Sequence, residues 1–507
     1  MLKANITDQG ILNLLDKYKI DLTIPNKVQE DLKTIPSEVS KSEKKDRIDL
    51  TDMMIITIDG EDTKDIDDAI SLEILPNKNF YLGVHIADVS HYVKENSSID
   101  RMALDQATSI YPVNCVVPML PKELSNGICS LNPNVERLAL SCFMEIDYTG
   151  EVVNYKICKT LIKSKYKMTY TAVSEIIEKD NKNIIDKYND IYSMLLDMKK
   201  LTLILMKKRK KRGCLDFESN ESKFLCDENN NILKVKPYER NLATQLIEEF
   251  MIVCNETIAT HCFNKNLPFL YRIHNKPKEE KMDTFREFIL PLGYELRSFC
   301  IKPKDLQKLL NDLKGKPEEK AINHLLLRSL TKAIYSSEKD NHFGLASECY
   351  CHFTSPIRRY PDLQIHRIIK ADIDDKLDYT TIKKFRNKVD SIDTFCSTKE
   401  QLSQRIERDS VKLKSAEYMS NKIGEKYTGI VNGINDLGFY IQLPNTIEGF
   451  VNIYSIQDDT YIFDEHRLLF MGEHSRRSFK IGDTLNIIVK SVNLTSFQID
   501  FILDEEV

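Results

Sequence analysis

A dense run of acidic residues near position 60 constrains this chain more than any other feature of its sequence. Six carboxylates fall between Asp59 and Asp68, directly after the apolar segment Met53–Ile58, which has the length of a β-strand and leads into an Asp-Gly turn. Two like charges about 4 Å apart repel by about 4 kcal/mol at an effective dielectric of about 20. Several such pairs gathered at one point could not all stay ionised without a cation, so the run predicts a divalent metal site.

The chemistry of the run narrows the choice of metal and of reaction. A donor set made only of oxygen favours Mg²⁺, with Mn²⁺ as the alternative. A solvated acidic loop is the competing interpretation, but Ile66 and Ala69 lie inside the run and apolar segments flank it. A calcium loop of the EF-hand type fits poorly, because its ordered pattern of acidic residues, glycine and distal glutamate is absent. Carboxylates that hold divalent metals suit the hydrolysis of phosphodiesters.

The segment Phe353–Asp362 contains two arginines, Arg358 and Arg359, between two prolines. The planar guanidinium fork binds two phosphate oxygens at once, and the prolines restrict the backbone that carries it. An arginine beside the metal would stabilise the charge that gathers on phosphorus in the transition state. The alternative is that both arginines form ion pairs with Asp362 or with surface acids.

Composition and charge place the chain among ordinary globular proteins. Its 507 residues are 42% hydrophobic and 29% charged, with a net charge of −5. We recognise no signal peptide and no apolar stretch that could span a membrane, so we expect a cytoplasmic protein without membrane association. Twelve cysteines include no CxxC pair and are expected to be reduced. The basic run Met206–Arg212 ends a predicted helix at Gly213, and is either a solvated helix end or a surface that follows phosphates.

Three regions are expected along the chain. A helical linker at 1–50 precedes an α/β (α+β) domain at 51–422, in which the apolar stripe of Ile247–Ile258 predicts a core helix and charged helices close the end. Short alternating apolar runs separated by turn residues follow at 424–503. Five or so short strands in such a stretch predict a small β-barrel.

Taken in order, the motifs resemble those of the ribonuclease II/ribonuclease R (RNB) family. They are IDGEDTKDIDDA, VHIADVSHYV, VPMLPKELSNGICSLNP, LYRIHNKP, HFGLA and HFTSPIRRYPDL. The RRYP form is more similar to ribonuclease R. The resemblance implies an RNB catalytic domain with a central channel, a C-terminal five-stranded OB-type S1 barrel, and processive 3′-to-5′ hydrolysis of single-stranded RNA to nucleoside 5′-monophosphates.

The resemblance also implies roles for the residues around the acidic run. Three aspartates match the metal ligands of the family: Asp59, Asp65 and Asp68. Asp67 matches the aspartate on which the chemistry depends most, and Arg358 matches the arginine at the scissile phosphate. These five residues are the core of the implied active site.

Other expected site residues lie far from the acidic run. Glu407 matches an acidic residue near the catalytic end of the channel. Tyr111 and Phe217 match two aromatics that clamp the terminal bases, although an aromatic taken singly is more often a core residue. Arg359 and Tyr440 are further expected RNA contacts.

Two departures from the family pattern affect RNA binding. The chain begins where the family's linker to the catalytic domain would, without the N-terminal cold-shock domains. In the expected S1 barrel, Leu437 and Asn452 stand where such domains often carry Phe and His, while Tyr440 keeps an aromatic place. We therefore expect the barrel to bind RNA weakly.

The sequence is compatible with three functions. The first is a monomeric exoribonuclease, favoured by the intact set of aspartates and Arg358. The second is a catalytically weak RNA-binding or regulatory protein of the same fold, suggested by the missing cold-shock domains. The third is a metal phosphoesterase for small substrates, which has no need of an S1 barrel.

Overall fold

A seven-stranded sheet forms the centre of the larger domain. The computed structural model describes residues 3–4, 6–217, 222–227, 232–238, 240–296, 301–316, 318–465 and 467–504. The strand order is β1-β6-β5-β4-β3-β2-β7. Strands β2 to β6 pair with their sequence neighbours in antiparallel fashion, while β1 joins β6 and β7 joins β2 in parallel. The strand bounds are β1 Ile48–Leu50, β2 Ile56–Asp59, β3 Asp68–Ile74, β4 Phe80–Ala87, β5 Glu136–Ile146, β6 Val152–Lys163 and β7 Tyr166–Thr169.

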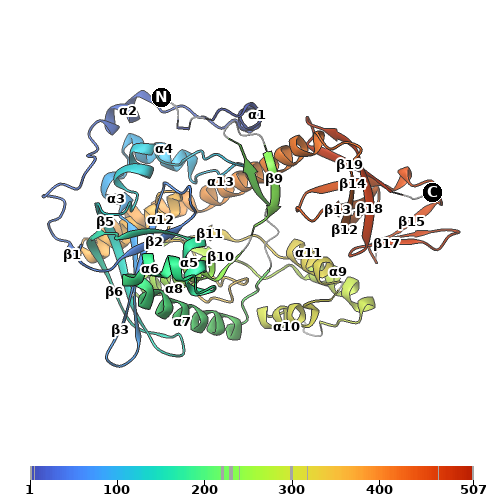
Figure 1. The fold of residues 1–507 in the computed structure, drawn as a ribbon. Helices are drawn as coiled ribbons and strands as arrows, with labels where there is room; N and C mark the ends of the chain where they lie inside the picture. Colours follow the sequence, from blue (N-terminus) through green and yellow to red (C-terminus); the bar gives the residue numbers. More distant parts are fainter. Residues whose placement is uncertain are drawn as a thin grey trace.

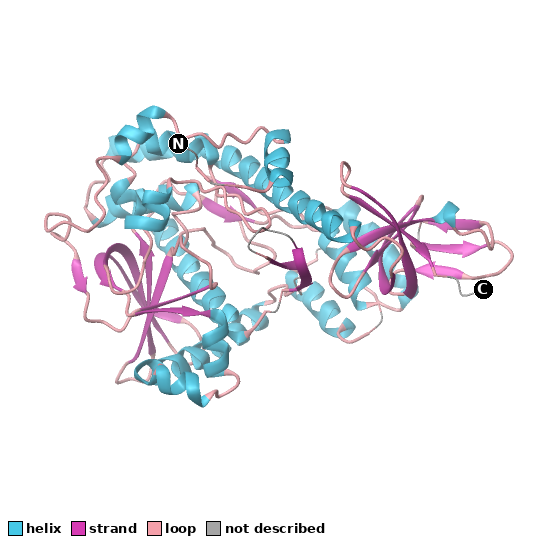
Figure 2. Ribbon diagram, turned by 45° about the horizontal axis from the view of Figure 1, so that its top comes forward, coloured by secondary structure: helices cyan, strands magenta, loops and turns pink. Residues whose placement is uncertain are grey.

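Helices lie on both sides of this sheet (Figure 2). Helix α5 contacts strand β2, α7 contacts β3, α8 contacts β4 and α12 contacts β6. The central strand β4 is buried at seven of its eight positions, because both of its faces are covered. The helices of the larger domain up to α8, together with α12, have the following bounds: α3 Val89–Tyr92, α4 Ser98–Gln106, α5 Tyr170–Ile177, α6 Lys182–Lys187, α7 Asn189–Arg212, α8 Leu242–Asn264 and α12 Tyr360–Ile373.

Helix α7 illustrates how the sequence pattern forms the packing. Its buried residues recur at helical spacing, and it ends at Arg212, with Gly213 in the left-handed conformation at φ 106°. A glycine adopts that conformation without steric cost, which explains why the helix stops there. The predicted end of the helix is confirmed.

Smaller elements connect the sheet to the rest of the molecule. Helices α1 Gln9–Lys17 and α2 Asn26–Leu32 precede it. Two antiparallel two-stranded sheets pair β8 Ser222–Cys226 with β9 Ile232–Pro237 and β10 Tyr271–Ile273 with β11 Ile334–Ser336. Three helices, α9 Glu279–Ile289, α10 Pro303–Leu313 and α11 Glu319–Ser329, share an apolar cluster of their own. The single helix α13, Tyr379–Ser420, then runs from the larger domain to the C-terminal barrel (Figure 1).

The C-terminal region is a closed five-stranded barrel, as expected. Its strands are β12 Lys426–Asn435, β13 Gly438–Gln442, β14 Glu448–Asn452, β18 Thr484–Asn493 and β19 Gln498–Leu503. A side sheet of β15 Tyr461–Asp464, β16 Leu469–Gly472 and β17 Ser478–Lys480 lies between β14 and β18 in the chain. Gly438 opens β13 at φ 154°, and a Cβ there would lie 2.1 Å from the Val451 carbonyl oxygen, so the close strand pairing requires glycine.

Over the residues that the structure describes, no helix has the length and apolar character needed to cross a membrane.

Candidate active site

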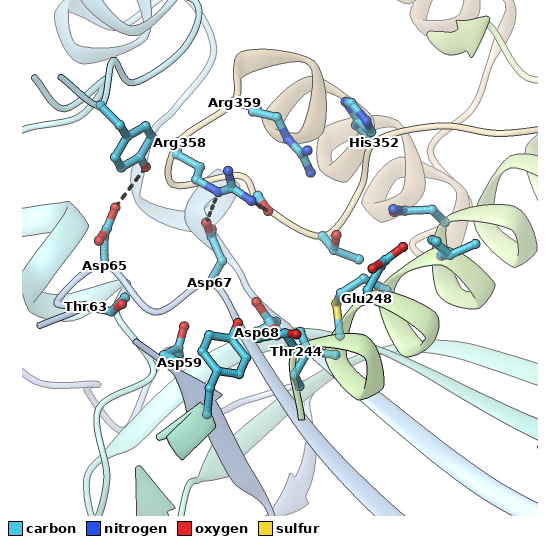
Figure 3. Close-up of a pocket in the computed structure, with 18 of the residues that line it drawn as sticks. Asp59, Thr63, Asp65, Asp67, Asp68, Thr244, Glu248, His352, Arg358 and Arg359 are labelled. Carbon is cyan, nitrogen blue, oxygen red and sulfur yellow. Dashed lines mark hydrogen bonds and ion pairs between the residues drawn. The ribbon is translucent and has the colours of Figure 1, made fainter. Parts of the chain in front are cut away.

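A cavity of about 530 Å³ opens where β2 ends, β3 begins, and the arginine segment meets helix α8 (Figure 3). Seven of the expected site residues line it: Asp59, Asp65, Asp67, Asp68, Tyr111, Arg358 and Arg359. Most of its other lining residues come from α8 and from the segment 350–355. The chain thus brings the acidic run and the arginine segment to one place, although almost 300 residues separate them in the sequence.

The loop between β2 and β3 holds the aspartates through buried contacts. The Ile66 side chain is fully buried, its backbone N–H donates to Ser130 Oγ at 3.1 Å, and Ser130 Oγ in turn donates to the Lys64 carbonyl at 2.7 Å. The Ala87 N–H donates to the Asp67 carbonyl at 2.9 Å. Because Ile66 is anchored in the core, the side chains of its neighbours Asp65 and Asp67 are directed to the cavity.

Asp67 joins the two sequence motifs directly. One carboxylate oxygen, Oδ1, accepts the Ile357 N–H at 2.8 Å, and Oδ2 lies 3.6 Å from Arg358 Nε. Only 4% of Asp67 is exposed, whereas 44% of the Arg358 side chain is. Arg358 Nη2 also donates to Ser355 Oγ at 3.0 Å, so the buried carboxylate and Ser355 together orient an arginine that is still partly exposed at the cavity.

Burial and mutual repulsion disfavour the charged form of the carboxyl groups in this cavity. Burial and the neighbouring Asp68 raise the pKa of Asp59 to about 8. Burial also raises the pKa of Asp68 to about 6 and that of Asp67 well above its usual range, although Arg358 opposes both shifts. Oδ2 of Asp59 and Oδ2 of Asp67 are buried without a hydrogen-bond partner. Unsatisfied buried oxygens and mutual repulsion are the conditions that a bound cation relieves.

The described residues do not form a preassembled metal cluster. Among them, no three His, Cys, Asp or Glu side chains converge closely enough to hold an ion by themselves. Asp65 instead accepts a hydrogen bond from the Tyr111 hydroxyl at 3.3 Å. The acidic donors nevertheless fit a hard cation, because they are oxygens that share one cavity and two of them lack a hydrogen-bond partner.

The two arginines have different partners. Arg359 Nη2 lies 2.7 Å from Oδ1 of the fully buried Asp362, which also accepts the Ser355 N–H at 2.8 Å. The alternative of an internal ion pair with Asp362 is therefore observed for Arg359, while Arg358 faces Asp67. Arg359 stabilises the loop, and Arg358 presents its guanidinium to the cavity.

Tyr111 is fixed from two sides. Its segment pairs with the arginine segment, since the Ser109 N–H donates to the Arg358 carbonyl at 2.9 Å. Its own N–H donates to Glu407 Oε1 at 3.0 Å, and the same oxygen accepts the Ser403 hydroxyl at 2.9 Å. Glu407 is not among the described residues that line the cavity. It supports the Tyr111 backbone from helix α13 instead.

Two further expected RNA contacts also lie away from this cavity. Phe217 is half-buried and packs beside the apolar cluster of α9–α11. Tyr440 lies on β13 of the barrel, 41% exposed, with its ring 5.0 Å from that of Phe450. Any RNA that touches both the cavity and Tyr440 must extend across the surface between the two domains.

Helix α8 contributes a wall of the cavity that sequence reasoning missed. Thr244, Glu248, Met251 and Asn255 face it at helical spacing. Ile247, which the apolar stripe assigned to the core, also lines it. The polar residues that alternate with the apolar ones on this helix, at the same helical spacing, were the signal in the sequence that could have indicated the wall.

Three of the six basic residues in the run Met206–Arg212 of α7 form ion pairs. Lys208 pairs with Glu151, Arg209 with Glu248 and Glu249, and Arg212 with Glu256. These pairs favour a structural role for Lys208, Arg209 and Arg212 over a surface that follows phosphates.

Comparison with protein families decides where the chain belongs. The RNB domain model matches residues 47–375, well over half of the chain, and the S1 RNA binding domain model matches residues 420–503. The chain belongs to the RNB family. Ribonuclease R 1 of Lactococcus lactis is 41% identical over 498 residues, which cover 97% of this chain and 61% of that protein. Ribonuclease R of Thermotoga maritima is 42% identical over 487 residues, covering 95% of this chain and 68% of that protein.

Solved structures of RNB proteins agree with this fold. Mycoplasma genitalium RNase R in complex with ribose methylated single-stranded RNA has a TM-score of 0.89 at 29% identity, covering 97% of this chain and 77% of that one. Yeast Ssd1, a pseudonuclease, has a TM-score of 0.73 at 21% identity, covering 92% of this chain and 58% of that one. The second match shows that the RNB fold also occurs in a protein described as a pseudonuclease.

Proposed function

We propose that this RNB protein is a metal-dependent exoribonuclease that hydrolyses single-stranded RNA processively from the 3′ end and releases nucleoside 5′-monophosphates. One observation carries the proposal. The buried carboxylate of Asp67 orients Arg358 at the mouth of a cavity that three further aspartates line. A phosphodiester with its metal ions needs this combination of negative and positive groups.

The cavity residues divide the work of binding and orientation. Asp59, Asp65 and Asp68 would hold Mg²⁺, with Mn²⁺ as the alternative. When bound, the metal supplies an activated water and neutralises charge on the phosphate. The exposed guanidinium of Arg358 binds the phosphate oxygens, and Asp67 keeps it in place through Nε. Tyr111, anchored by Glu407, offers an aromatic surface for the terminal base.

The substrate and setting of the enzyme complete the proposal. The complex of the Mycoplasma relative with single-stranded RNA supports RNA as the substrate. We also propose that Phe217, Arg359 and Tyr440 contact this RNA. A cytoplasmic location, a monomeric state and the absence of membrane association rest on the sequence alone.

A catalytically weak RNA-binding protein is the second candidate. The pseudonuclease Ssd1 supports it only at the level of fold, since its identity to this chain is 21%. The arrangement of Asp67 and Arg358 favours the enzyme, because a protein that only binds RNA has no need of a buried, repelling set of carboxylates.

A gel assay tests the choice. The protein is mixed with a 5′-labelled, unstructured RNA and Mg²⁺, with Asp67→Asn as the control. Shortening from the 3′ end to a short limit product, absent in the variant, is the expected result. RNA that stays intact but migrates more slowly on a native gel would instead identify a binding protein.

A further inference from the structure

Arg240 links the segment that ends at Phe217 to the α8 wall of the cavity. Its Nη1 lies 2.8 Å from Asp216 Oδ1, and its Nη2 lies 2.6 Å from Glu248 Oε2. Asp216 directly precedes Phe217, while Glu248 lies on the cavity wall. We propose that Arg240 is a positioning residue that ties the Phe217 segment to this wall and so sets the distance over which RNA bases stack. The inference rests on the proposed function.

The backbone before Phe217 is anchored step by step. At Gly213 a Cβ would lie 2.6 Å from Lys304 Cγ, so this position requires glycine. Gln307 Nε2 donates to the Cys214 carbonyl at 2.9 Å, and the Leu215 N–H donates to the Gly344 carbonyl at 2.9 Å. The ion pair of Asp216 with Arg240 is the next contact along the chain, immediately before Phe217.

The second terminal nitrogen of Arg240, Nη2, holds Glu248 in place. The second carboxylate oxygen of Glu248, Oε1, lies 3.1 Å from Arg209 Nη1, and Arg209 Nη2 in turn lies 2.7 Å from Oε1 of the buried Glu249. Both oxygens of Glu248 are thus held by arginines, although 37% of its side chain remains exposed. Figure 3 shows Glu248 on the same helix as Thr244, facing the cavity that contains Asp68.

The link between Asp216 and Glu248 requires a guanidinium group at position 240. Two carboxylates from different segments bind its two terminal nitrogens, and an ammonium group offers no planar fork to span them. Without this link, the last backbone anchor before Phe217 is at Leu215, so Phe217 is held less firmly relative to the wall and the ordering of a stacked RNA costs more conformational entropy. Asp67 and Arg358 do not contact Arg240 and keep their own arrangement. Loss of Arg240 should therefore weaken RNA binding more than it slows the chemical step.

The test uses the full chain and RNA that carries 2-aminopurine, whose fluorescence falls on stacking, at successive positions from the 3′ end. In the Asp67→Asn background, which removes hydrolysis from the readout, Arg240→Gln should lose the quenching that depends on Phe217. In the otherwise native chain, the same change should raise KM about tenfold and lower kcat by less than about threefold. Arg240→Lys should recover only part of the loss.

Lys208→Gln is the control, because it removes a cation–glutamate pair of helix α7 at Glu151, and neither Lys208 nor Glu151 is among the described residues that line the cavity. It should leave quenching and KM unchanged. Asp216→Asn, at a largely exposed carboxylate, repeats the test if Arg240→Gln unfolds.

Equal effects of Arg240→Gln and Lys208→Gln, or native quenching and KM in both Arg240→Gln and Asp216→Asn, would overturn the inference. An inactive native chain whose quenching still depends on Arg240 would refute the proposed exoribonuclease and leave the positioning role standing.

Discussion

The cavity and the C-terminal barrel use charge and burial in opposite ways. In the cavity, buried carboxylates such as Asp59 and Asp67 lack sufficient partners and depend on groups brought from distant parts of the chain. On the barrel, Tyr440 and Leu437 are exposed on one hairpin whose strands pair locally. We therefore expect changes in the cavity to disturb neighbouring members through their shared contacts, and changes on the barrel to act separately. The following predictions test this contrast, from the largest expected effect to the smallest.

Removal of metal should have the largest effect. Treatment with EDTA should reduce hydrolysis to background, a loss of more than about 10³-fold, and Mg²⁺ or Mn²⁺ should restore it. Because a cation relieves the repulsion among Asp59, Asp67 and Asp68, Mg²⁺ should also raise the melting temperature of the native chain. Asp59→Asn serves as the control, since its melting temperature should respond less. Full activity in EDTA would contradict the metal site.

Asp67→Asn should lower kcat by about 10³-fold or more, because it removes both the charge and the group that orients Arg358. The RNA affinity, measured by fluorescence anisotropy, should change by less than about threefold, since binding relies on other contacts. An equal loss of affinity and of circular-dichroism signal would show that Asp67 stabilises the fold and has no special part in the chemistry.

Arg358→Lys should lower kcat by about 10²-fold, because an ammonium group keeps the charge but loses the fork that binds phosphate oxygens. Arg359→Lys is the natural comparison. Arg359 pairs with buried Asp362, so its replacement should lower the melting temperature more than Arg358→Lys does. Identical thermal and kinetic effects at the two positions would mean that the arginines share one role.

Tyr440→Ala should have the smallest effect. One exposed aromatic contributes about 1 kcal/mol to stacking, so the affinity for a long RNA should fall about fivefold and kcat should not change. A short RNA that fills only the cavity should bind as before. A loss of kcat comparable to that of the cavity variants would remove the contrast between the two regions.

The parts of the molecule that could be predicted from sequence are those whose signal is local. The acidic run, the arginine segment and the alternating strands of the barrel each lie within a short stretch. The wall formed by Thr244 and Glu248 was missed, because an apolar stripe on the same helix indicated only a core. Residue type and spacing alone could not separate Arg358 from Arg359, and only the family resemblance singled out Arg358. Adjacent residues find different partners only once the loop is folded.

Long-range packing decided the remaining positions. Glu407 was expected near the catalytic end of the channel, and it does reach the site, but through the Tyr111 backbone. The link from Asp216 through Arg240 to Glu248 joins three segments that no periodicity connects. Such contacts depend on the relative placement of helices and loops, which the sequence pattern alone does not specify.

Helix α13 gives the molecule a mechanical property. Its 42 residues correspond to a rod about 63 Å long. One part of the rod supports Tyr111 through Glu407, and a later part contributes Ala416 and Met419 to the apolar cluster of the barrel. Tyr18 braces it between these points, with its hydroxyl 2.7 Å from Asp409 Oδ2. A movement of the barrel is therefore transmitted along this helix to the segment of Tyr111 at the cavity.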